Sequence, residues 1–203
     1  MAKSNVTSDI IKLERARLSF PQIWRAKSFE KDREAQFQAT FLLDPSDSEH
    51  AAMIKKIHRA FKAITTEAFD GWDDVPPGKR CFGLADKHSK KKEYDGYKGM
   101  FYIATGNTVQ PTLVDRKRRD LEESDGVLYA GCYVNSNITL WTYDHPIGGK
   151  GVAANLRIIQ FVDDGEAFGN APAKADEELE DVEASDDGAD DNWDAENDED
   201  DLS

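Results

Sequence analysis

The sequence predicts a mainly β fold, a small antiparallel barrel or sandwich with one amphipathic helix inserted at residues 46–69. Three observations support this fold class. Several short segments alternate apolar and polar residues, one long segment has helical spacing, and the last part of the chain is almost wholly polar and acidic. We therefore expect a folded domain over residues 1–170 and a disordered acidic tail over residues 171–203.

Two strands are predicted near the start of the chain. Residues 10–18 (IIKLERARL) mix apolar and charged positions with a break in phase near Arg15, which indicates a strand with a bulge that ends at Phe20-Pro21. Residues 35–43 (AQFQATFLL) alternate as a half-buried strand does. Residues 19–34 between them are predicted to form a connector in which aromatic and basic side chains are interleaved.

The clearest element is the helix at residues 46–69. Ser46 followed by Glu49 has the pattern of a capping box, and apolar residues recur at helical spacing from Met53 to Ala68. The opposite side carries lysines and an arginine. Such a basic face can meet phosphates, although a solvated helix face is the commoner explanation.

The sequence of the second half of the chain predicts strands joined by polar turns. Residues 87–99 are basic, aromatic and rich in glycine, which indicates an exposed loop. The segment at 148–151 (GGKG) lacks the spacing of a phosphate-binding loop and is predicted to be a hairpin turn. Strands are predicted at residues 100–105, 112–114, 128–143 and 152–162, the longest of them bending at Gly131 or near Asn135.

Charge is distributed unevenly along the 203 residues, whose net charge is −14. Residues 163–203 contain 19 acidic residues and one lysine, which leaves a charge of +4 on residues 1–162. The tail has too few large apolar residues to offset an ordering cost of about 1 to 2 kcal/mol per residue. An acidic tail on a basic body either maintains solubility or competes with a nucleic acid for the body's basic surface.

Several classes of protein are excluded or disfavoured. No apolar run approaches the length of a membrane span, and the first residues do not resemble a signal peptide, so we expect a cytoplasmic protein with no membrane partner. Two isolated cysteines and four unpaired histidines do not form a metal-binding pattern. No nucleophile motif is present either. We predict no catalytic residue, no metal and no cofactor.

Aromatic and basic residues are interleaved in three regions of the body. Single-stranded nucleic acid is bound by cations that neutralise phosphates and by aromatic faces on which bases stack. In the structural alternative, the aromatics fill the core and nearby acids neutralise the arginines of the turn after residue 114. The candidate DNA-binding residues are Arg17, Trp24, Arg25, Lys27, Phe29, Lys90, Lys91, Lys92, Tyr94, Tyr97, Lys98, Tyr102, Arg116 and Arg118.

Several stretches also resemble a known family. They are Gly96–Met100, Gln110–Asp115, Leu128–Val134 and Gly149–Leu156, the last running into Ile159–Glu166. In order and spacing they are similar to bacteriophage single-stranded DNA-binding proteins once classed as a domain of unknown function. The resemblance covers the body from about Lys12 to Gly169.

This resemblance implies an oligonucleotide/oligosaccharide-binding (OB) barrel that binds single-stranded DNA during phage replication or recombination, in the cytoplasm of the infected bacterial cell. It also implies that an acidic C-terminal tail is often present. From the uneven charge we expect this tail to compete for the DNA-binding face and to contact replication or recombination proteins. Proteins of this functional class often end in an aromatic residue, whereas this chain ends Asp201-Leu202-Ser203. Docking of the tail tip into a partner pocket is therefore not predicted.

Two alternative functions stay open at this stage. One is a protein-interaction scaffold whose acidic tail mimics DNA. The other is a metal-dependent nuclease that uses carboxylates such as the adjacent pair Asp73-Asp74. Self-association, the number of nucleotides covered and the preference for DNA over RNA are also left open by the sequence.

Overall fold

A computed structural model describes residues 5–28, 34–88 and 90–169 of the chain. The predicted acidic tail, residues 171–203, lies outside the described residues, so its boundary and its disorder stay predictions.

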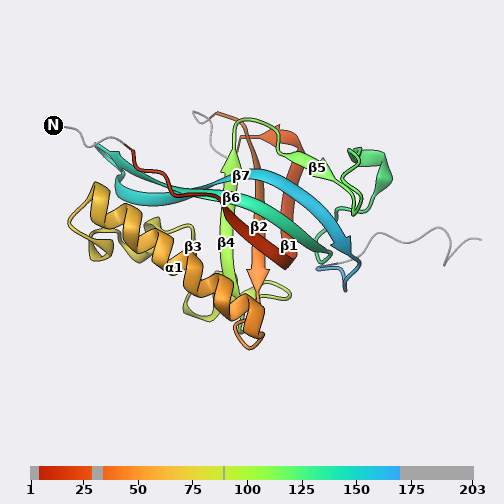
Figure 1. Cartoon of the computed structure of the whole chain (residues 1–203), viewed down its shortest axis with the longest axis horizontal. Coiled ribbons are helices and arrows are strands. Elements are labelled where there is room, and N and C mark those ends of the chain that lie inside the picture. Colours follow the sequence, from red (N-terminus) through yellow and green to blue (C-terminus); the bar gives the residue numbers. More distant parts are fainter. Residues whose placement is uncertain (1–4, 29–33, 89, 170–203) are drawn as a thin grey trace, which may run out of the picture. The chain divides into compact units, whose positions relative to one another are not determined.

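Five strands form a closed barrel (Figure 1). Strand β1 pairs antiparallel with both β2 and β6, β2 pairs with β4, and β6 pairs with β7. The ring closes where β4 and β7 run parallel, at Gly106 and Asn155. This order is that of an OB barrel and confirms the predicted fold class. The five strands are β1 (Ile11–Lys27), β2 (Gln36–Leu43), β4 (Phe101–Asn107), β6 (Tyr133–His145) and β7 (Gly149–Asp163).

Two short strands extend the sheet. Strand β5 (Thr112–Val114) runs parallel to β7, and β3 (Phe82–Leu84) pairs with the first half of β4. The residue before β3 connects β4 with β7: Cys81 donates its backbone N–H to Val152 (3.1 Å), and Ala104 donates to the Cys81 carbonyl (2.7 Å). This segment therefore fills the space where β4 and β7 diverge.

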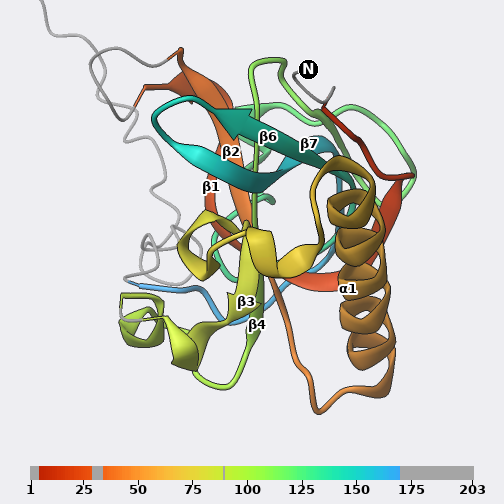
Figure 2. The same cartoon turned by 90° about the vertical axis from the view of Figure 1, so that its left-hand side faces the viewer.

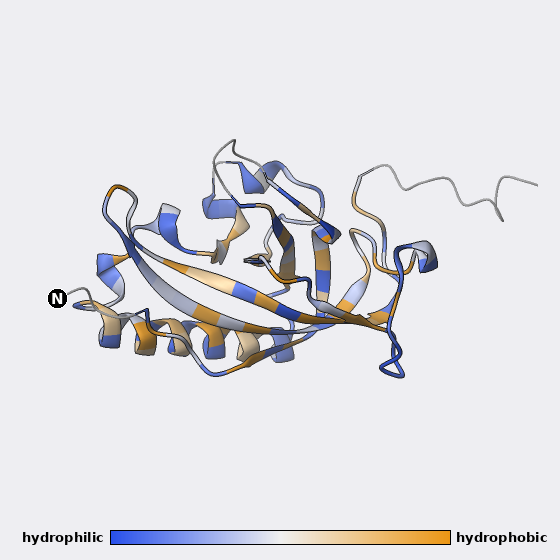
Figure 3. Ribbon diagram, turned by 90° about the horizontal axis from the view of Figure 1, so that it is seen from above, coloured by the Kyte–Doolittle hydropathy of each residue, from blue (hydrophilic) through white to orange (hydrophobic). Residues whose placement is uncertain are grey.

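The core lies inside the barrel and under the helix. Alternate residues of the strands point inward, which is why apolar and polar positions alternate along the ribbons in Figure 3. Leu13, Phe41, Ile103, Leu140 and Leu156 are all fully buried. The outward positions on the same strands are therefore left to form the functional surface.

Helix α1 (Ser48–Ala68) contacts β1, β2 and β6 (Figure 2). Its buried side chains Ile57, Phe61 and Ile64 join the barrel core. The inserted helix is confirmed, but the predicted cap is wrong. Asp47, and not Ser46, accepts the first free backbone N–H groups, because its carboxylate reaches the N–H of both Glu49 and His50. The short 3₁₀ helices are η1 (Trp72–Asp74), η2 (Pro77–Lys79), η3 (Ala85–Lys87), η4 (Lys91–Glu93) and η5 (Glu123–Asp125).

Strand β1 is longer than its sequence pattern predicts. The bulge near Arg15 is confirmed, since the register with β6 shifts between Leu13 and Ala16 and Arg15 has a φ of 50°. The strand does not end at Phe20-Pro21, however. A second bulge absorbs these residues, and the pairing with β2 continues to Lys27.

Strand β6 begins at Tyr133 rather than at residue 128. Gly131 has a φ of 113°, a conformation that interrupts a regular strand, as the predicted bend there required. In the described part of the chain, the longest helix is too polar to cross a bilayer.

Candidate functional site

A groove of about 1030 Å³ crosses the outer face of the barrel over β2, β4, β7 and β6. Its floor is made of small side chains, among them Ala104 of β4 and Ala153 of β7, while Gln36 and Gln38 line the β2 side. We call this depression the outer groove. Its shape suits a flat ligand, because the small floor residues leave room for rings to approach the sheet.

Two aromatic side chains line the β6 side of the outer groove. Trp141 and Tyr143 are alternate residues of one strand, so both point outward, and their ring centroids are 5.6 Å apart. Their partners across the sheet are small, Ala153 opposite Trp141 and Gly151 opposite Tyr143. A Cβ atom on Gly151 would collide with the Tyr143 ring, because it would lie 2.1 Å from Cζ. The sequence of β7 therefore makes the space that the Tyr143 ring occupies.

The charged groups that line the outer groove are all basic. Lys79 is exposed, and Arg80 is fixed by a hydrogen bond from its Nε to the Val75 carbonyl (2.9 Å) and by stacking over Trp72 at 4.4 Å. No aspartate or glutamate is found among the described residues that line the groove. The groove is thus compatible with a polyanion.

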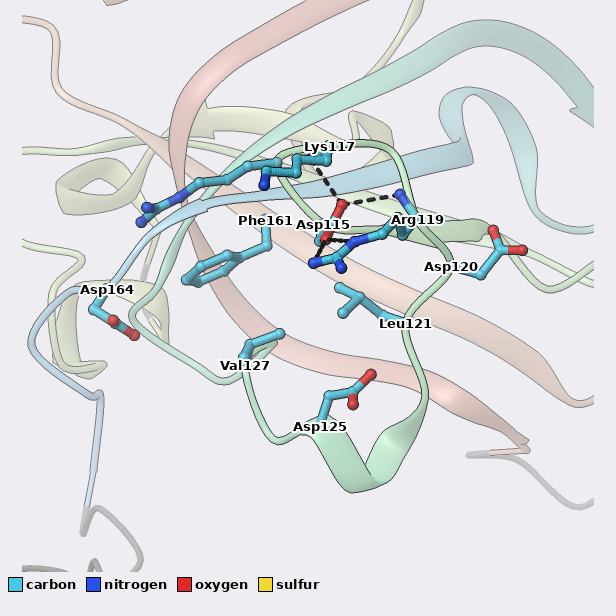
Figure 4. Close-up of a pocket in the computed structure, with 10 residues that line it drawn as sticks. Asp115, Lys117, Arg119, Asp120, Leu121, Asp125, Val127, Phe161 and Asp164 are labelled. Atoms are coloured by element: carbon cyan, nitrogen blue, oxygen red, sulfur yellow. Dashed lines mark hydrogen bonds and ion pairs between the residues drawn. The ribbon is translucent and has the colours of Figure 1, made fainter.

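A second pocket, of about 740 Å³, lies beside β5 and has a different character (Figure 4). Asp115 accepts a hydrogen bond from Arg119 (2.6 Å), and hydrogen bonds from the Arg119 backbone and side chain hold the pKa of Asp115 below its usual value. Asp120, Asp125 and Asp164 also line this pocket. Arg116 and Lys117 line it as well, so its charges have both signs, whereas the outer groove has basic groups alone among its described charged lining residues; the second pocket is therefore the poorer candidate for nucleic acid.

Three of the predicted arginines contact other residues of the chain, although the Arg25 and Arg116 side chains stay largely exposed. Arg17 donates hydrogen bonds to the carbonyls of Gly131 (2.6 Å) and Glu166 (2.5 Å). Arg25 pairs with Glu123 (3.3 Å) and Arg116 with Asp163 (3.0 Å). The Arg116 pair, like that of Arg119 with Asp115, agrees with the structural alternative in which nearby acids neutralise the arginines of the turn after residue 114.

Two of the predicted stacking tyrosines belong to the core. Tyr97 is fully buried and Tyr102 nearly so, in a second apolar cluster with Leu42 and Ala85. Burial raises the pKa of both phenols, and the Tyr97 hydroxyl donates to Ser19 Oγ (3.2 Å). Because both side chains are buried, neither ring has a face free for a base. The assignment of Tyr97 and Tyr102 as stacking residues is corrected accordingly.

The other predicted residues are spread over the surface. Trp24 is half-buried against the core, and exposed Lys27 is in register with Gln36 at the β2 side of the outer groove. The Lys91 ammonium lies 4.6 Å from the centre of the Tyr102 ring, and burial lowers the pKa of Lys91. Lys90, Tyr94 and Lys98 are exposed in the loop before β4, and Arg118 is exposed after β5. Phe29 and the side chain of Lys92 lie outside the described part of the chain.

The structure therefore brings Lys27 to the edge of the outer groove, but it does not gather the predicted residues there. Sequence reasoning missed Trp141 and Tyr143. A signal was available, since two aromatics at alternate positions of one strand face the same side, and the next strand offers Gly151 and Ala153 at alternate positions.

The nuclease alternative has little support in the folded body. Asp74 accepts a hydrogen bond from the Lys150 ammonium (2.7 Å), so one member of the Asp73-Asp74 pair is already used. Within residues 5–28, 34–88 and 90–169, no three metal-ligating side chains gather in one place.

Comparison with known proteins identifies similar sequences and structures. The family model described as "Enterobacter phage Enc34, ssDNA-binding protein" matches residues 9–190. Protein p50 of Acyrthosiphon pisum secondary endosymbiont phage 1 is 33% identical over 178 residues, which is 85% of this chain and 93% of p50.

Two solved structures share the barrel. The single-stranded DNA-binding protein from bacteriophage Enc34, in complex with ssDNA, is 26% identical with a TM-score of 0.68, covering 79% of this chain and 89% of that one. The single-stranded DNA-binding protein gp2.5 of bacteriophage T7 is 16% identical with a TM-score of 0.50, covering 90% of this chain and 100% of that one. The likeness to gp2.5 is one of fold alone.

Proposed function

Because the chain belongs to the family of the Enterobacter phage Enc34 ssDNA-binding protein, we propose that it binds single-stranded DNA in the outer groove. The observation that carries this proposal is the pair Trp141 and Tyr143, set over small residues in a groove lined by basic and neutral side chains. The face formed by the second and third barrel strands, together with its bordering loops, is where OB barrels bind oligonucleotides. Those strands here are β2 and β4.

Stacking explains a preference for single strands. An unpaired base presents both faces to an aromatic ring, and each stacked base contributes about 1 to 3 kcal/mol. In a duplex the same faces are covered by neighbouring base pairs. The amides of Gln36 and Gln38 on the opposite side can hydrogen-bond base edges, and Lys79 can neutralise a phosphate at the rim. Binding of this kind depends little on sequence.

We place this activity in phage DNA replication or recombination, in the cytoplasm of the infected bacterial cell. A protein that coats unpaired strands prevents hairpins and protects the strand until the next enzyme uses it. This role needs no chemical step, so we assign none to the protein. The support for it is family membership and the character of the outer groove.

The acidic tail is proposed to compete with DNA for the same groove. Residues 171–203 contain 16 acidic residues and one lysine. A polyanion joined to the body is present at high effective concentration and is displaced when DNA supplies more phosphates and stacked bases. Because the outer groove has basic residues and no described acidic lining residue, it is the surface that such a tail would meet.

The test is fluorescence anisotropy of labelled single-stranded and duplex DNA of one length, with the full chain and with a variant ending at Asn170. We expect a preference for the single strand and tighter binding by the shortened variant. Unchanged or weaker binding after shortening would contradict competition by the tail. If neither protein binds DNA, the nucleic-acid function is wrong and a protein-interaction scaffold becomes the better explanation.

A further inference from the structure

A bulge in β1 turns one aromatic side chain out of the barrel. Ser19 pairs with Thr40 and Gln22 pairs with Gln38, so three steps along β1 face two steps along β2. Phe20 lies in this bulge with a φ of 46°, a conformation that an aromatic residue rarely adopts. Bulges often redirect a side chain, and strained backbone is often found where a side chain has a function. The bulge thus leaves the Phe20 side chain exposed on the surface.

Phe20 is part of an aromatic cluster with a buried base and an exposed top. Residue Phe20 is 56% exposed, and its ring meets the ring of Tyr94, a residue that is 39% exposed, edge to face at 5.1 Å. Tyr97 lies beneath both, at 6.2 Å from Phe20 and 5.3 Å from Tyr94. We call the two exposed rings the Phe20–Tyr94 platform. Adjacent exposed aromatic rings form an apolar patch, and exposed apolar patches often mark a binding surface.

The loop that carries Tyr94 also supplies cations. Lys90 and Lys98 are exposed on either side of Tyr94 in the sequence. Of the carboxylates in this loop, Asp86 accepts the N–H of Gly99 (3.0 Å) and Asp95 accepts that of Gly169 (3.2 Å), while Glu93, next to Tyr94, is exposed. A base on the platform would therefore have lysines nearby for its phosphates.

The platform continues the outer groove along the same face of the sheet. Thr40 is the next outward position of β2 after Gln38, about 7 Å along the strand. Thr40 pairs with Ser19 of β1, and the hydroxyl of Tyr97, the ring beneath the platform, donates a hydrogen bond to Ser19. Strands β1 and β6 pair directly on one side of the barrel, but across the outer groove, through β7, β4 and β2, they are four strand spacings apart, or about 19 Å along the sheet at about 4.8 Å each. A strand that crosses the groove from Trp141 towards β2 therefore reaches the platform next.

We propose that Phe20 and Tyr94 form a second stacking site, which holds a base of the same single strand after the strand leaves the outer groove. The proposal rests on the proposed function and deepens it, because it gives the bound strand a direction and a length. It accounts for the strained bulge, for the two exposed rings and for the exposed lysines beside them.

The experiment measures the affinity for labelled oligothymidylates from about 4 to about 16 nucleotides, the range of site sizes of one OB fold. Phe20→Gly removes the ring and relieves the positive φ, so this variant is expected to fold. Tyr94→Ala removes the second ring, and the matched control Tyr94→Phe keeps it. Trp141→Ala reports on the outer groove, and thermal unfolding of each variant checks its fold.

Phe20→Gly and Tyr94→Ala should each weaken binding of the long oligonucleotides by about fivefold or more, the low end of the effect of removing one stacking ring. The shortest oligonucleotides, which fit in the groove alone, should bind both variants as they bind the unaltered chain. Tyr94→Phe should change nothing.

The outcomes separate the two proposals. If Trp141→Ala weakens binding while Phe20→Gly and Tyr94→Ala leave it unchanged at every length, the second site is wrong and the groove stands. Equal weakening at all lengths also overturns a site beyond the groove. If the unaltered chain binds no oligonucleotide, both proposals fail. Loss confined to the long oligonucleotides, with Trp141→Ala affecting all of them, supports both.

Discussion

Gly151→Ala tests whether Tyr143 binds DNA without altering Tyr143 itself. The backbone of Gly151 lies in a regular strand without a positive φ, so alanine suits the backbone. Its Cβ would nevertheless lie 2.1 Å from Cζ and 2.2 Å from the hydroxyl oxygen of Tyr143. The ring must swing away, and Tyr143 can do so because it is on the outer face and only half-buried.

The expected loss of affinity follows from stacking. Removing one stacked ring costs about 1 to 3 kcal/mol, and because Tyr143 is displaced rather than deleted we expect the lower part of this range, about tenfold in Kd. The melting temperature should change by less than about 3 °C, since the fold keeps its core. Gly78→Ala is the matched control: Gly78 also lines the outer groove, but a Cβ there meets nothing within 4 Å.

The affinity for one oligothymidylate is measured by anisotropy titration for four variants. These are Gly151→Ala, Gly78→Ala, Tyr143→Ala and the double variant Tyr143→Ala with Gly151→Ala. If Gly151→Ala acts through Tyr143, it should have no further effect once Tyr143 is alanine. The reasoning is refuted if Gly151→Ala binds as tightly as Gly78→Ala. It is also refuted if Gly151→Ala weakens binding equally in both backgrounds.

Other parts of the structure make predictions of their own. Asp47→Ala should lower the melting temperature by about 2 to 4 °C, whereas Ser46→Ala should change it little, as thermal unfolding at neutral pH will show. Because hydrogen bonds from the backbone hold the pKa of Asp47 below 3.8, its contribution is present above that pH and should be lost as the pH falls further. Arg17→Met should lower the free energy of unfolding by about 2 to 3 kcal/mol in urea titrations, because it removes two hydrogen bonds from a charged group, while DNA affinity per folded molecule stays near that of the unaltered chain. In anisotropy titrations at several salt concentrations, the log–log slope of DNA affinity should be only about −3, because the four cations Lys79, Arg80, Lys90 and Lys98 make about four phosphate contacts that each contribute about −0.7.

The fold was predictable because periodicity reports directly on which residues are buried. Alternation in residues 35–43 and helical spacing up to Ala68 both reflect one buried face, and the structure has a strand and a helix there. Element ends were less predictable. Phe20-Pro21 looks like a strand end because proline lacks an N–H, and only the partner strand shows that a bulge absorbs both residues.

The candidate site was harder to predict because it consists of outward positions from four strands. No local pattern joins Gln38 to Trp141, which are about a hundred residues apart in the sequence and border the same groove only because the barrel closes. The burial of a side chain cannot be predicted from the local sequence either. Tyr94 and Tyr97 are near neighbours in one basic loop, yet Tyr97 is fully buried and Tyr94 is exposed.

Clusters of basic residues in the sequence were a poor guide to the groove for a physical reason. An arginine has five N–H donors and is often used to tie irregular segments to strands, as Arg17 and Arg116 are used here. The outer groove instead has a neutral floor, two ring faces and few cations. Affinity in such a site comes largely from stacking, which salt screens little, and the weak expected salt dependence follows from the same arrangement. Under the proposed competition, a tail of 16 carboxylates has no bases to stack, so DNA that fills the groove should displace the tail.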